Sequence, residues 1–240
     1  MSAFHDAGRT FRDPTQVARL VTAGLVLAAV FQVGVTIVIG RWLVAGTTVS
    51  ISMSERGALG PGGWRVFQLV AAMISTSQQV VLLIWQYRVH TNARLAAPHL
   101  VPTSPGWGVL CWFVPFVNFV KPYLVLREIR VASVPQTNNG GWTLRLLWGA
   151  FLGSLAMLWI GLFDVMFDAF EAMRSLVPLR VLIFELDGTA LRSFAVAELL
   201  ALAAVLCWVR FVREVTRSQV AIGPTTTPVI GKVPARPDVS

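Results

Sequence analysis

Polar side chains lie inside two of the long apolar segments of this chain, and they are the first candidates for chemistry. Gln78 and Gln79 fall in the middle of one segment, and Glu198 is the only acid well inside another. Amide and carboxylate groups in hydrocarbon require partners or water, because burying them unpaired is costly. They predict either a path for protons, cations or small solutes, or contacts that hold helices together. We favour helix contacts for the two glutamines, and for Glu198 an ion pair with Arg192 or solvation at the interface.

The other reactive residue types form no recognisable site. His5, His90 and His99 share no metal-ligand spacing, and Cys111 and Cys207 lie in apolar segments, where cysteine behaves as a small hydrophobe. The sequence contains no Ser-His-Asp order, phosphate-binding loop or HExxH motif. We therefore predict that the protein is not an enzyme and that it binds no metal or cofactor.

The elements that carry these residues are membrane helices. Of the 240 residues, 55% are hydrophobic and 13% charged, whereas soluble proteins carry about 25% charged residues. A helix of about 20 apolar residues crosses a bilayer core about 30 Å thick. We expect an all-α integral membrane protein with four transmembrane helices and a proline-broken re-entrant or interfacial hairpin. The predicted parts are a lead (1–13), a membrane domain (14–217) with spans at about 20–40, 66–87, 142–163 and 191–209 and the hairpin at 106–133, and a disordered tail (218–240).

Prolines define the hairpin. Only 15 residues separate Pro105 from Lys121, which is too few for a span, and Pro115 interrupts them. Pro122 fits the first turn of a second helical limb. Irregular backbone at membrane depth is tolerated only where it is buried in protein or lines water. We expect loops at 47–63 and a mixture of short helix and loop at 163–187.

The basic residues predict the orientation. With four spans, fourteen of the twenty lysines and arginines fall on the side of the two termini, as the positive-inside rule requires. This places both termini in the cytoplasm and the helices in the inner (plasma) membrane. The formal net charge of +8 does not indicate nucleic-acid binding, because the basic residues mark segment ends and form no stripe. The expected partners are the lipid bilayer and a membrane protein or second copy.

A dense motif follows the second predicted span. It comprises Trp85, Arg88 and Asn92, then Ser104, Pro105, Gly106 and Trp107, then Trp112, Pro115 and Asn118, and finally Pro122 and Glu128. This order of residues resembles the bacterial membrane family called domain of unknown function 4328. The resemblance implies a polytopic membrane protein without an established activity, and it carries over no catalytic residue. From the residues themselves, Asn118 can cap the break in the hairpin, and we hypothesise that Arg88 pairs with Glu128.

Three functions fit these observations. The first is a membrane interaction or scaffold protein that uses the hairpin as a docking surface on the cytoplasmic face. The second is a channel or transporter for ions or small solutes, with a path along the hairpin, Gln78, Gln79 and Glu198. The third is an enzyme acting on lipid, which would require convergent reactive groups that the sequence does not supply. We favour the first.

Overall fold

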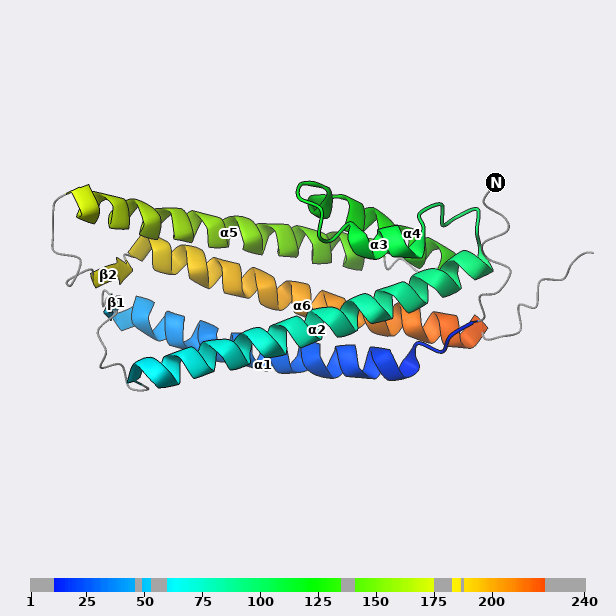
Figure 1. Ribbon diagram of the computed structural model, residues 1–240, viewed down its shortest axis with the longest axis horizontal. Helices are drawn as coiled ribbons and strands as arrows, with labels where there is room; N and C mark the ends of the chain where they lie inside the picture. Colours follow the sequence, from blue (N-terminus) through cyan, green and yellow to red (C-terminus); the bar gives the residue numbers. More distant parts are fainter. Residues whose placement is uncertain are drawn as a thin grey trace, which may run out of the picture. The chain divides into compact units, whose positions relative to one another are not determined.

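The computed structural model describes residues 11–45, 49–52, 60–134, 141–174, 183–186 and 188–222 (Figure 1). These residues are mainly helical, as predicted. Two strands of four residues each, β1 (Val49–Ser52) and β2 (Ile183–Leu186), pair antiparallel with Val49 opposite Leu186. The helices are α1 (Thr15–Ala45), α2 (Gly60–Ala96), α3 (Pro105–Leu110), the 3₁₀ helix η2 (Val117–Phe119), α4 (Lys121–Ser133), α5 (Gly141–Arg174) and α6 (Gly188–Ile222).

Three stretches within these helices are long and apolar enough to cross a membrane. Among the described residues they are Thr15–Gly34, Gly141–Phe167 and Thr189–Ile222, and they match the first, third and last predicted spans. The remaining predicted span, 66–87, lies within the single helix α2. Most of its first half lies outside the residues whose side chains are described, so that span stays a prediction.

Three predicted boundaries differ from the structure. Helix α5 continues without a break to Arg174, whereas a span ending at about 163 and a separate short helix after it were expected; residues 164–174 contain neither Gly nor Pro to end a helix. Strand β1 occupies part of the predicted loop 47–63, and α2 already begins at Gly60. The tail predicted from 218 is also wrong for its first five residues, because α6 continues to Ile222 and Gly-Pro follows directly.

The chain forms two compact units, each built from segments far apart in the sequence. The motif unit comprises residues 1–16, 85–138 and 214–240, and the helical unit comprises 17–84 and 139–213. In the motif unit, the buried apolar core includes Trp85, Val89, Val101, Cys111, Val125, Leu126, Ile129 and Val215. The segments that enclose this core are the end of α2, α3, α4 and the end of α6.

Close helix packing in the helical unit depends on glycine. A β-carbon added at Gly161 of α5 would lie 2.8 Å from the ring of Phe194 in α6, and one at Gly153 would lie 3.1 Å from Leu200. Helices α5 and α6 therefore pack closely along this line. Gly149 has open space around it, so only one glycine of the Gly149/Gly153 pair serves this packing.

Candidate functional site

Four residues of α2 in the motif region are buried in the motif unit. Trp85 and Val89 lie one turn apart on the helix, and Gln86 and His90 lie on the adjoining face; all four are fully or almost fully buried. The indole Nε1–H of Trp85 donates to Thr216 Oγ1 on α6 at 3.1 Å. Two polar side chains at the centre of an apolar core require partners, and each finds them in the segment that follows.

Gln86 fastens α3 to α2. Its Nε2 donates to the carbonyl of Gly108 at 2.7 Å, and its Oε1 accepts from Trp112 Nε1 at 2.9 Å. Cys111 Sγ also donates to Gly108 O, at 3.2 Å, so this carbonyl has two donors. One buried amide therefore positions both the helix α3 and the turn after it.

His90 packs between α3 and the loop before it. Its Nε2 lies 3.1 Å from the carbonyl of Thr103, so Nε2 carries the proton and donates. Its Nδ1 is buried with no hydrogen-bond partner among the described residues. The pKa of His90 is lowered to about 4, mainly because burial desolvates the charged form; the hydrogen bond to Thr103 partly opposes this shift, and the charge of Arg94 adds to it. The imidazole is therefore neutral near pH 7 and serves packing.

Glu128 of α4 binds the backbone and side chain of Thr103. Its Oε1 accepts from Thr103 Oγ1 at 2.9 Å, and its Oε2 accepts from Thr103 N at 3.3 Å. The predicted pair between Arg88 and Glu128 is wrong. Arg88 donates instead to the carbonyl of Asp13, at 3.4 Å. This contact is possible because residues 11–16 belong to the same unit as Arg88.

Asn92 joins the two ends of the described chain. Its amide pairs with the backbone of Arg12 in both directions: Oδ1 accepts from Arg12 N at 3.1 Å and Nδ2 donates to Arg12 O at 2.8 Å. The same Nδ2 donates to Gln219 Oε1 at 3.2 Å. Gln219 Nε2 then donates to Val89 O and to Ser133 Oγ, both at 2.8 Å. These contacts bring the entry to α1, α2, α4 and the end of α6 together (Figure 1).

Two of the hairpin prolines stand at helix starts, and for Pro122 this start was predicted. Pro105 is buried at the start of α3, where Ser104 Oγ accepts from Trp107 N at 3.3 Å, and Pro122 is buried in the first turn of α4. Proline suits this position because its missing N–H would have no partner there.

The break between the two limbs centres on Phe116. Its φ of 65° is in the left-handed region and is the only such value for a non-glycine residue in the described part of the chain. Pro115 is exposed beside it, and its carbonyl accepts from Val117 N at 2.8 Å. Asn118 does not cap the break with its side chain as predicted, since its buried Oδ1 has no partner among the described residues.

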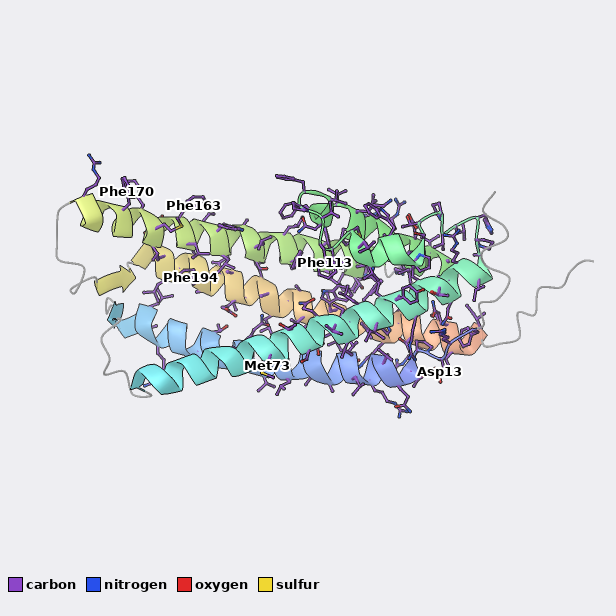
Figure 2. The ribbon with its side chains drawn as sticks, in the orientation of Figure 1. Asp13, Met73, Phe113, Phe163, Phe170 and Phe194 are labelled. Carbon is purple, nitrogen blue, oxygen red and sulfur yellow. The ribbon has the colours of Figure 1, made fainter. Side chains whose placement is uncertain are left out.

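The outer side of this segment is apolar and open. Trp107, Leu110, Phe113, Phe116 and Phe119 are all exposed, with Phe116 reaching 84%; we call these five residues the apolar edge. Figure 2 labels Phe113, which follows α3 and precedes η2 along the chain. Gly106 is exposed too, whereas Trp112 is half-buried because of its bond to Gln86. The motif thus has a hydrogen-bonded inner side and an exposed apolar outer side.

A model for the family described as domain of unknown function (DUF4328) matches residues 63–217, which is well over half of the chain. The chain belongs to the DUF4328 family. No match was found among curated proteins, and none among solved structures. The hydrogen bonds described above form the polar network of the motif unit. The DUF4328 match includes Trp85, Gln86, Asn92 and Glu128 of this network, but Arg12 and Gln219 lie outside the match. The network of this DUF4328 protein therefore recruits both flanking segments.

The intramembrane polar residues lie in the helical unit. Gln78 donates to the carbonyl of Val21 in α1 at 3.1 Å, whereas the neighbouring Gln79 is exposed. Gln78 thus acts as the predicted contact between helices. The predicted ion pair of Glu198 with Arg192 is absent: among the described residues, the buried Glu198 Oε2 has no hydrogen-bond partner, and Arg192 is exposed.

Several residues of the network gave little signal in the sequence. Thr103 and Ser133 are common polar residues near helix ends, and Gln219 fell in the predicted tail. His90 was considered in the sequence only as a metal ligand, and Gln86 carried no signal of its own. Within the described residues, no three His, Cys, Asp or Glu side chains lie together as a metal site.

Proposed function

We propose that this DUF4328 protein is a multi-pass protein of the bacterial plasma membrane that acts through contacts, as a membrane interaction or scaffold component. The three apolar helices support a membrane location, and the distribution of basic residues supports cytoplasmic termini. In this proposal, the motif unit lies on the cytoplasmic side and its hairpin is the contact surface.

The carrying observation is how the motif uses its polar and apolar groups. Gln86, Asn92, Glu128 and Gln219 each bind other parts of the same unit, so their polar atoms are occupied in building it. A catalytic site would instead require accessible groups converging on a substrate. The unit exposes the apolar edge, and exposed apolar patches are typical of surfaces that bind proteins or membranes.

A photoreactive amino acid at Phe113 tests this proposal in living cells. Phe113 is exposed and belongs to the apolar edge. Arg127 is the matched control, because it is exposed on α4 of the same unit but lies outside that edge. We expect covalent adducts from position 113 and few from position 127. Equal adduct yields at the two positions would contradict a dedicated contact surface.

One observation supports the alternative of a channel or transporter. Glu198 carries a buried, unpartnered carboxylate oxygen within the candidate span Thr189–Ile222. Carboxylates at such depth commonly serve proton or cation movement. Proton flux into vesicles containing the purified protein, abolished by Glu198→Gln, would support this alternative and defeat the scaffold proposal. No flux with either protein would support the contact role.

A further inference from the structure

The apolar edge has a period of three residues. The five residues of the apolar edge are exposed. Pro105, Gly108 and Cys111 also recur every three residues, but they are offset by one position from the edge and are buried. The backbone explains part of this period, because Trp112 N, Phe113 N, Phe119 N and Val120 N bond to the carbonyl three residues earlier, whereas other amides of the segment bond to carbonyls two or four residues earlier. A turn of three residues stacks side chains at i and i+3 on one side. The segment therefore separates a core side from an apolar side.

The base of this segment is fixed in place. Gly108 is held by Gln86 through its carbonyl, Trp112 is held by the same amide, and Pro122 is buried where α4 begins. The exposed phenylalanines therefore project from a preformed base. Exposing them to water is unfavourable, in proportion to the apolar surface that they leave uncovered.

We propose that the apolar edge inserts into the lipid of the cytoplasmic leaflet, with the acyl chains of the bilayer as its occupant. This rests on the proposed function and names the contact that the hairpin makes.

Charge supports lipid as the occupant. Residues 105–120 contain no charged side chain, and Lys121 follows them directly. An apolar segment ended by a cation is typical of the interface with anionic lipid, where the long basic side chain reaches the headgroups.

Chain connection supports the same occupant. Only residues 135–140 separate the end of the described α4 segment from Gly141, the first residue of the candidate span in α5. On its other side, α2 enters the motif unit at Trp85, directly after most of the predicted span 66–87. The hairpin is thus joined at both ends to segments expected in the bilayer.

An environment-sensitive fluorophore tests this in the full-length protein. Single cysteines replace Phe116 or Phe113, are labelled with NBD, and the protein is reconstituted into vesicles of phosphatidylglycerol and phosphatidylethanolamine. Arg127→Cys is the solvent control, and Val30→Cys, an exposed position within the first candidate span, is the lipid control. The parent protein measures background labelling of Cys111 and Cys207.

We expect the labels at 116 and 113 to behave like the label at 30. Their emission shifts to the blue, lipid-borne nitroxide quenches them, and aqueous iodide quenches them several-fold less than the label at 127. If they resemble position 127 both in vesicles and in cell membranes, the lipid proposal and the contact surface both fail. If they are protected only in cell membranes, a protein covers the edge; the lipid proposal then fails while the proposed function survives.

Discussion

Gly108 lies so close to His90 that a β-carbon added at residue 108 would be 2.5 Å from Nδ1 of the imidazole. The ring cannot easily move away, since its Nε2 bonds to the carbonyl of Thr103. This approach lets α3 pack directly on α2, and it makes residue 108 sensitive to any side chain.

Gly108→Ala should therefore destabilise the motif unit by about 1–3 kcal/mol, the usual cost of overpacking. Gly106→Ala is the matched control, because it lies in the same short helix and a β-carbon there meets nothing within 4 Å. The apparent unfolding temperature in detergent should fall for the first variant only. Equal temperatures for the two variants would show that the ring can give way.

Stability should depend on pH through His90. Its pKa is lowered to about 4 by burial, whereas in the unfolded chain it is near 6.5. The unfolded state therefore binds a proton first as the pH falls, and stability is lost between about pH 6.5 and pH 4, by up to about 3 kcal/mol. Above this range the folded and unfolded states both hold a neutral ring.

Unfolding of His90→Gln measured across this range should show a shallower loss than the parent. His99→Gln is the control, because His99 is exposed and its replacement should leave the slope unchanged. An unchanged slope in His90→Gln would assign the acid sensitivity to other groups.

Gln219→Ala should destabilise the protein by about 2 kcal/mol, because it leaves Asn92, Ser133 and the carbonyl of Val89 short of a partner. Val220→Ala, at an exposed neighbouring position, should have little effect. Thermal unfolding of the two proteins measures the difference. Similar values would mean that the end of α6 contributes little to the unit.

The ion pair between Arg130 and Glu214 should be detectable by charge reversal. Arg130 Nη2 lies 3.0 Å from Glu214 Oε1, and the two side chains are only 13% and 15% exposed. Either single reversal should cost about 2 kcal/mol, and the double reversal should recover part of it, because opposite charges face each other again. No recovery in unfolding experiments would exclude a direct electrostatic contribution.

Gln78→Leu should weaken the protein more than Gln79→Leu. The first loses the bond to Val21 of α1 that holds two helices, and such bonds contribute about 0.6–2 kcal/mol. The second residue is exposed and makes no such contact in the described part of the chain. A steric-trapping or thermal assay in bilayer mimics measures both. A larger loss of stability for Gln79→Leu would show that Gln79, and not Gln78, makes the stabilising polar contact.

The sequence predicted what depends on local pattern. Apolar length predicted the long helices, and Pro122 predicted the start of α4. The family motif predicted which region holds the site.

Pairings between distant segments could not be predicted in this way. We expected Arg88 to pair with Glu128, but in the folded unit it donates to the carbonyl of Asp13. That partner comes from residues 11–16, which are far from Arg88 in the sequence. Gln219 was assigned to a polar tail because nothing near it in the sequence is its partner. Its three partners lie in α2 and α4, far away along the chain. Such partners depend on tertiary placement, for which a single sequence carries no periodic signal.

Gln219 also has a consequence for how the protein is made. The described part of the motif unit combines residues 11–16, 85–134 and 214–222, so Gln219 is synthesised after the two segments that it joins. Until the ribosome has released that residue, Asn92 and Ser133 lack a bonding partner that the finished unit gives them. Chains that stop before Gln219 therefore cannot close this unit, and they present its polar interior to quality-control proteases.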